Sequence, residues 1–219
     1  MKRWLMFVQF CGFYILLAAV LFGGAGRFDV PRLWAYIGAY LVIMLVGVSV
    51  LDPSLYRERV RPGGKRRPWS LHILSALFVT HLLVAGIEAG RYRWTPPVPL
   101  AVECAAFVAF TVCFAVVVWA MHVNPFYSSV VRIQTERGHT LVTAGPYRWV
   151  RHPGYAATIV VCLASGMALG SWAAVVVLFP IVPFVLFRVV TEDAFLKKNL
   201  PGYSEYAARV SHRLVPGVW

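Results

Sequence analysis

The chain has 219 residues, of which 59% are hydrophobic and only 14% are charged. A soluble globular domain is typically ~25% charged and about 45–50% apolar, so this composition excludes an ordinary soluble domain and indicates a membrane protein. The net charge of +12 would also suit a nucleic-acid-binding protein, but the basic residues are spread over the loops between apolar blocks. We therefore expect no nucleic-acid partner, and a positive surface that faces the headgroups of a lipid bilayer.

Four apolar blocks are each long enough to cross the roughly 30 Å hydrocarbon core of a bilayer as a helix. Met1-Lys-Arg ahead of the first block also resembles the start of a signal peptide, and cleavage there is the alternative to a retained span. Because the apolar run is long for a signal peptide, we expect the span to be retained. The four predicted spans are Trp4–Phe22, Leu33–Leu51, Leu71–Gly90 and Val98–Val123.

A fifth apolar block, Tyr155–Val190, is too long for one span and too short for two full spans with a long loop. Gly166, Gly170 and Ser171 near its middle predict a tight helical hairpin. Pro180 and Pro183 predict a kink in its second leg, which neighbouring helices can tolerate inside a membrane. The expected fold is therefore all-α and polytopic, with about six transmembrane helices, of which the last two form a short hairpin.

The basic residues predict how the chain is oriented in the membrane. If the N-terminus lies in the cytoplasm, 17 of the 21 Lys and Arg fall in cytoplasmic segments and four fall outside. The positive-inside rule selects this orientation. We therefore expect a multi-pass integral membrane protein whose N- and C-termini are both cytoplasmic.

Two polar segments, Asn124–Pro153 and Thr191–Trp219, flank the predicted hairpin. Because the two legs of a hairpin begin and end at the same face, the segments should meet there and make His152 and Glu192 neighbours. The stretch from Glu192 onward has the pattern of an amphipathic helix at the membrane surface. We expect one integrated membrane domain, in which residues 1–123 shape the substrate side and residues 124–219 supply a cofactor-binding loop, the hairpin and a cytoplasmic tail.

Several kinds of site are not supported by the sequence. The four cysteines fall inside predicted spans and form no CxxC pair, so we expect neither a disulfide framework nor a metal site. No GxGxxG or GxxxxGK[ST] loop, Gly-x-Ser-x-Gly elbow or HExxH motif occurs. Glu103, His81 and His122 lie in predicted spans, and we expect them to be structural.

The polar segments gather residues that can do chemistry. Each one has an ordinary structural explanation, since aromatic residues anchor membrane interfaces and Arg188 and Glu192, four apart on a helix, can form a simple ion pair. Charged groups kept at membrane depth are costly, however, and usually functional. The cluster comprises Gln134, His139, Tyr147, His152, Tyr155, Arg188, Glu192, Tyr203 and Tyr206.

In their order along the chain, these residues resemble the isoprenylcysteine carboxyl methyltransferase family and its phospholipid methyltransferase relatives. The resemblance covers roughly Asn124–Trp219 and includes Gln134 with His139-Thr-Leu-Val-Thr143, Gly145-Pro-Tyr147, Arg151-His-Pro153 with Tyr155, Arg188-x-x-Thr-Glu192, Gly202-Tyr-x-x-Tyr206 and Arg213-x-x-Pro-Gly-x-Trp219. It implies an all-helical membrane enzyme that uses S-adenosylmethionine. The usual Glu-Glu pair of the family is Glu192-Asp193 here.

The resemblance also implies roles for individual residues. Arg188 and Glu192 match a pair associated with activity in the family, so we expect both to be catalytic. No metal is implied. The residues expected to border the cofactor are Gln134, His139, Leu141, Gly145, Tyr147, His152, Pro153, Tyr155, Glu192, Tyr203 and Tyr206.

The leading hypothesis is a methyltransferase that is dependent on S-adenosylmethionine and acts on a lipophilic or small membrane-permeable acceptor. Methylation of a carboxylate oxygen is favoured, while N-methylation of a lipid amine and S-methylation of a thiol stay open. Two alternatives of another class are a nicotinamide-dependent membrane reductase and a non-catalytic membrane scaffold.

Overall fold

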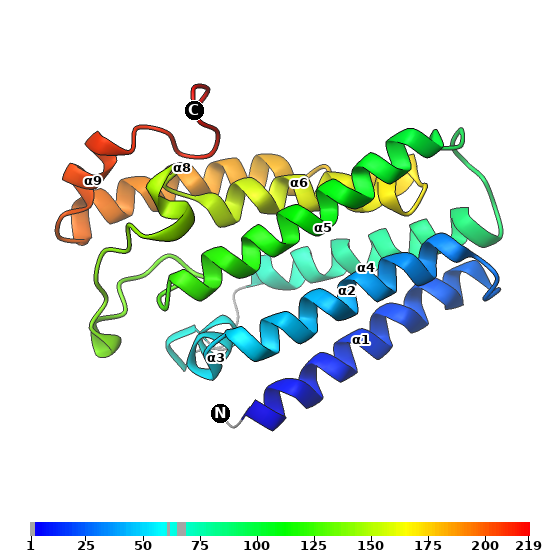
Figure 1. Cartoon of the computed structure of the whole chain (residues 1–219), viewed down its shortest axis with the longest axis horizontal. Helices are drawn as coiled ribbons and strands as arrows, with labels where there is room; N and C mark the ends of the chain where they lie inside the picture. The colour runs from blue at the N-terminus through cyan, green and yellow to red at the C-terminus, as the bar shows by residue number, and fades with distance from the viewer. Residues whose placement is uncertain (1–2, 61, 65–68) are drawn as a thin grey trace.

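The computed structural model describes residues 3–60, 62–64 and 69–219, and these are folded almost entirely as helices. Six longer helices run side by side along the long axis of the molecule (Figure 1). They are α1 (Arg3–Ala25), α2 (Pro31–Val50), α4 (Trp69–Gly90), α5 (Leu100–Val123), α6 (Pro153–Ala168) and α8 (Ile181–Asn199). Shorter helices are α3 (Pro53–Val60), α7 (Trp172–Leu178) and α9 (Tyr203–Arg209), with 3-10 turns η1 (Pro62–Gly64), η2 (Thr135–Arg137) and η3 (Gly145–Arg148).

Five described helical segments are long and apolar enough to cross a membrane, which makes the chain a polytopic membrane protein. Four of them, Phe7–Ala25, α2, α4 and α5, coincide with the four predicted spans. The fifth, Trp172–Asn199, contains α7 and α8, whereas α6 is a shorter apolar helix of 16 residues. The prediction was about six transmembrane helices, with the last two short. The described residues contain five candidate spans and one shorter apolar helix, α6.

The predicted hairpin is present between α6 and the α7–α8 segment. Gly170 at its turn has a φ of 73°, a conformation that glycine adopts without steric cost. Ser171 caps α7, since its hydroxyl accepts a hydrogen bond from the backbone N–H of Ala174 at 2.9 Å. A Cβ on Gly166 would lie 2.6 Å from the backbone nitrogen of Val175, so this position needs glycine for the two legs to approach so closely. Pro180 separates α7 from α8, as the proline pattern predicted.

Small residues bring α1 and α4 into close contact. Gly86 and Gly90 are spaced as in a GxxxG motif, and a Cβ on either would overlap the backbone carbonyl oxygen of Leu21 or Ala25 on α1. Lipid tails are as apolar as leucine side chains, so helix association in a membrane depends on such close packing rather than on apolar burial.

A buried polar network joins four helices in the interior. The two ring nitrogens of His81 lie 3.0 Å from the carbonyl oxygen of Ala174 and 2.8 Å from the hydroxyl of Ser165. The Ser165 hydroxyl in turn lies 2.8 Å from that of Tyr36. Because both ring nitrogens have partners, His81 is the satisfied structural residue that we expected. Glu103 likewise pairs with Arg32, at 3.4 Å, away from the predicted cluster.

The loops separate into the two ends of the helix bundle (Figure 1). The α1–α2 and α4–α5 loops and the hairpin turn lie at one end; α3, the segment between α5 and α6, and α9 lie at the other. The two polar segments therefore meet, as the hairpin predicted. One expectation needs correction: Glu192–Asn199 is the last part of α8 and not a separate surface helix, and Asp193 within it is 1% exposed.

Candidate active site

An open pocket lies where the two polar segments meet. Its walls come from the α5–α6 segment, the start of α6, the end of α8, and α9. Among the residues predicted for the site, those that line this pocket are His139, Leu141, Tyr147, His152, Pro153, Tyr155, Glu192, Tyr203 and Tyr206. The hairpin thus brings together side chains that are up to 67 positions apart in the sequence.

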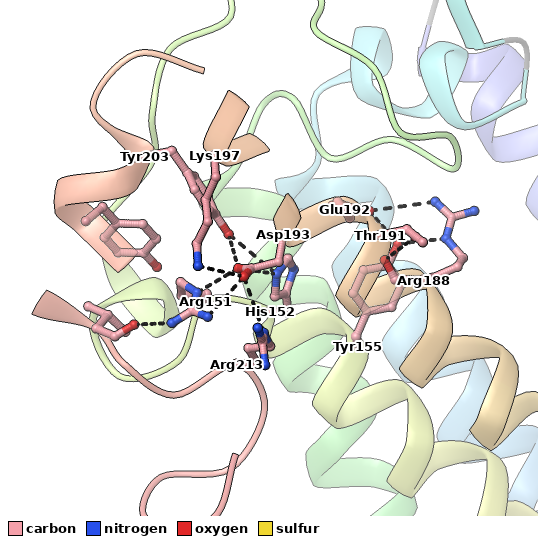
Figure 2. Close-up of polar contacts among 12 residues, drawn as sticks. Arg151, His152, Tyr155, Arg188, Thr191, Glu192, Asp193, Lys197, Tyr203 and Arg213 are labelled. Carbon is pink, nitrogen blue, oxygen red and sulfur yellow. Dashed lines mark hydrogen bonds and ion pairs between the residues drawn. The ribbon is translucent and has the colours of Figure 1, made fainter. Parts of the chain in front are cut away.

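Tyr155 links the two predicted catalytic residues (Figure 2). Its hydroxyl donates a hydrogen bond to Oε2 of Glu192 at 2.8 Å and accepts one from Nε of Arg188 at 3.0 Å. Arg188 and Glu192 share a face of α8, as predicted from their spacing, with Nη2 and Oε2 3.8 Å apart. A tyrosine on the first hairpin leg therefore fixes a cation and an anion on the second.

Arg188 itself stands behind the pocket wall and retains an unused donor. Its Nη1 donates to the backbone carbonyl oxygen of Ser129 at 2.8 Å. Its Nη2 is buried and, within the described part of the chain, has no hydrogen-bond partner. A buried donor without a partner carries a free-energy penalty of ~1–3 kcal/mol, and an anionic group that binds beside Glu192 would relieve it.

Asp193, which the sequence analysis named only as the neighbour of Glu192, has a structural role. Its carboxylate is buried and lies at the centre of a group of polar side chains (Figure 2). Oδ1 accepts hydrogen bonds from Nε of Arg151 at 2.8 Å and from the hydroxyl of Tyr203 at 2.9 Å. Nε of Arg213 lies 3.3 Å from Oδ2. A buried charge is stable only when it is paired in this way, so Asp193 holds the base of α6, α8, α9 and the C-terminal segment together.

The C-terminal segment is bonded directly to the corner that precedes α6. The backbone N–H groups of Arg151 and His152 donate to the carbonyl oxygens of His212 and Arg213, at 3.0 and 2.9 Å. Arg151 Nη1 also donates to the carbonyl oxygens of Val210 and Ser211. These bonds fix the backbone at His152, whose side chain lines the pocket.

Three buried tyrosines line the pocket as neutral groups. Burial raises the pKa of Tyr206 to about 12, and it also raises the pKa values of Tyr147 and Tyr203 above the usual range. The hydroxyl of Tyr206 donates to the backbone carbonyl oxygen of Tyr147 at 2.7 Å. The wall they form is uncharged, and it presents aromatic faces and hydroxyl groups.

His139 lies at the other side of the pocket and stacks on Phe126, with ring centroids 4.3 Å apart. Burial lowers the pKa of His139, and the positive charges of Arg132 and Arg137 lower it further. The imidazole is therefore neutral at neutral pH, and its Nδ1 accepts a hydrogen bond from the backbone N–H of Gln134 at 3.2 Å.

Two of the predicted cofactor residues lie outside the pocket lining. Gln134 is fully buried, donates to the carbonyl oxygen of Phe126 at 2.7 Å and accepts from Arg137 at 2.6 Å. Gly145 has a φ of 57° at a turn, where a Cβ would lie 2.9 Å from a side-chain carbon of Val123. The structure thus places both residues where they shape the loop that carries the wall.

Comparison with known proteins relates this part of the chain to a family of methyltransferases. Residues 104–198 match the profile of the isoprenylcysteine carboxyl methyltransferase (ICMT) family. A protein-S-isoprenylcysteine O-methyltransferase of Schizosaccharomyces pombe is 33% identical over 87 residues, which are 38% of this chain and 36% of the relative. The cobalt-zinc-cadmium resistance protein CzcN of Cupriavidus metallidurans is 37% identical over 78 residues, 35% of this chain and 36% of that protein. The matches thus span about a third of each curated relative.

The fold is shared over a longer stretch. The structure of a eukaryotic intramembrane Ras methyltransferase, ICMT, superposes with a TM-score of 0.61 over 92% of this chain and 73% of that one, at 18% sequence identity. The pocket and the Arg188–Tyr155–Glu192 group fall mostly or wholly within the matched residues 104–198. Residues 104–198 of this polytopic membrane protein are therefore similar in sequence to the isoprenylcysteine carboxyl methyltransferase family, and 92% of the chain shares the fold of an ICMT structure.

Proposed function

We propose that the chain is a membrane methyltransferase that transfers the methyl group of S-adenosylmethionine, the methyl donor of this family, to a lipophilic or small membrane-permeable acceptor. The observation that carries the proposal is the Arg188–Tyr155–Glu192 group beside a pocket lined by aromatic and polar side chains. Arg188 and Glu192 are the residues we propose as catalytic, and Tyr155 fixes both.

The residues of the pocket fit the chemistry of this cofactor, which supplies an electrophilic methyl group on a sulfonium. Glu192 offers a negative charge to the cationic centres, and the faces of Tyr147 and Tyr155 offer cation–π contacts. His139, stacked on Phe126, provides an aromatic surface for a base. We assign the remaining lining residues Leu141, His152, Pro153, Tyr203 and Tyr206 to the walls around it.

The proposed acceptor is a carboxylate, because Arg188 has a buried Nη2 ready to donate to an anion. A carboxylate oxygen attacks the methyl carbon in line with the breaking C–S bond, and no proton has to move. Positioning and exclusion of water therefore provide most of the acceleration. An amine acceptor would first have to lose a proton, for which Glu192 and His152 are the candidate bases. N- and S-methylation are the alternatives within the same proposal.

For the membrane arrangement we propose six crossings, with α6 as the shortest, and cytoplasmic N- and C-termini. The excess of basic residues at the end that holds the pocket supports this orientation. Residues 1–123 would then shape the acceptor side and residues 124–219 the cofactor side, as parts of one integrated membrane domain.

The test is methyl transfer by the purified protein from S-adenosylmethionine with a radiolabelled methyl group. Lipophilic carboxylates, lipid amines and thiols should be compared at equal concentration. We expect label in a carboxylate ester, which is recognised by its release as methanol in base. Label in the amine or thiol would move the proposal to the corresponding alternative. No transfer to any of them, with the protein folded, would refute it.

A further inference from the structure

The chain outside the matched segment supplies a buried carboxylate that supports the pocket wall from behind. Glu58 on α3 is 7% exposed and accepts four hydrogen bonds. Nε and Nη2 of Arg132 donate to its two oxygens, both at 2.9 Å. The hydroxyl of Ser128 donates at 3.0 Å, and the backbone N–H of Gly63 at 3.1 Å. Burial alone would raise the pKa of Glu58, but these bonds outweigh it and hold the pKa below the usual value.

The partners of Glu58 connect it to the site. Ser128 and Arg132 are the ends of a short stretch of the pocket wall that also includes Val130 and Val131. Between them, the carbonyl oxygen of Ser129 accepts the hydrogen bond from Nη1 of Arg188. Glu58 therefore fixes the side chains of this stretch, and the backbone of the stretch in turn fixes the guanidinium of Arg188.

From this arrangement we infer that Glu58 is a positioning residue for methyl transfer. It acts through Ser128 and Arg132 on the backbone at Ser129, and so on the direction of the Arg188 guanidinium. The α3 segment is then the means by which the N-terminal region controls the acceptor side of the site. This inference rests on the proposed function.

The chain offers a matched control in Glu136, the second carboxylate beside Arg132. Glu136 Oε1 lies 2.6 Å from Nη2 of Arg132, but the Glu136 side chain is 54% exposed. Exposed ion pairs contribute little, and within the described residues the hydrogen bonds from Ser128 and Gly63 go to Glu58 and not to Glu136. Loss of Glu136 should therefore leave the wall in place, whereas loss of Glu58 should release it.

The experiment compares Glu58→Ala, Glu58→Gln and Glu136→Ala in methyl transfer and in binding of S-adenosylhomocysteine. A misplacement of about 1 Å at a reacting centre can lower the rate ~100-fold. We therefore expect Glu58→Ala to lower kcat/KM for the acceptor roughly 10- to 100-fold. Affinity for S-adenosylhomocysteine should fall by a smaller factor than kcat/KM, because the released stretch is one part of the pocket wall, whereas the direction of Arg188 depends on it through Ser129. Glu136→Ala should match the wild type in both.

The results separate this inference from the proposed function. If the wild type neither binds S-adenosylhomocysteine nor transfers methyl, the proposed function fails. If the wild type is active and folded Glu58→Ala stays within about twofold of it, the positioning role is refuted. It is also refuted if cofactor affinity falls in parallel with activity, or if Glu136→Ala is equally impaired. Should Glu58→Ala not fold, Glu58→Gln, which keeps the volume and loses the charge, decides by the same criteria.

Discussion

Replacing Tyr155 by phenylalanine removes one oxygen atom from the centre of the proposed site and leaves the ring in place. That oxygen makes two hydrogen bonds to charged partners, one to Glu192 at 2.8 Å and one from Arg188 at 3.0 Å. A hydrogen bond to a charged group contributes ~1.5–3 kcal/mol. Because Arg188 and Glu192 can move from 3.8 Å into direct contact, part of the loss is recovered. We expect a net loss of about 2–3 kcal/mol in transition-state stabilisation, equal to a roughly 30- to 150-fold lower kcat/KM.

The assay is the initial rate of methyl transfer at varied acceptor concentration, with binding of S-adenosylhomocysteine measured in parallel. Tyr92→Phe is the matched control, since Tyr92 is 63% exposed and lies in the α4–α5 loop, at the opposite end of the bundle. Cofactor affinity should change little, because the aromatic face of residue 155 is kept. A Tyr155→Phe variant with a rate within about twofold of the wild type would refute the idea that this hydroxyl fixes the two charges.

Three further substitutions test other parts of the account. Arg188→Ala should lose about 2–4 kcal/mol of transition-state stabilisation, measured as a lower kcat/KM for methyl transfer, because it removes a buried charge next to Glu192. Unchanged kinetics would remove Arg188 from the mechanism. Gly86→Ala should destabilise the fold by about 1–3 kcal/mol, because the added methyl group overpacks the contact between α1 and α4, and the melting temperature in detergent should fall. Gly38→Ala, where a Cβ meets nothing within 4 Å, should leave the melting temperature unchanged. Asp193→Ala should cost about 3–5 kcal/mol of stability, because it leaves the buried guanidinium of Arg151 without its carboxylate partner, while Asp29→Ala at an exposed pair should be near neutral. Equal melting of the two variants would contradict the central role of Asp193.

The helical layout could be predicted from the sequence because it depends on local properties. Apolar blocks of span length fixed four helices, and Gly166, Gly170 and Ser171 predicted the hairpin turn that the structure shows. Once the hairpin is given, the meeting of the two polar segments follows. Most of the residues predicted to border a cofactor line one pocket for this reason.

The side-chain partners could not be predicted, because they depend on how loops fold between helices. Asp193 follows Glu192 and is four positions before Lys197, a spacing that is typical of a solvent-exposed ion pair on a helix. Only the backbone course of residues 210–213 reveals that it is buried among cations. Likewise, Glu58 and Arg132 are 74 positions apart, and nothing in either segment indicates the other. Gln134 belongs to a recognisable motif, but the motif does not indicate that its side-chain amide donates a hydrogen bond to the loop backbone instead of lining the pocket.

Use of S-adenosylmethionine is the central claim, and ligand-dependent melting of the detergent-solubilised protein tests it most directly. At a ligand concentration 100-fold above Kd, binding stabilises the folded state by about 2.7 kcal/mol. We predict a rise in melting temperature with S-adenosylhomocysteine and none with NADPH at the same concentration. A rise with NADPH and none with S-adenosylhomocysteine would contradict the account and favour a reductase.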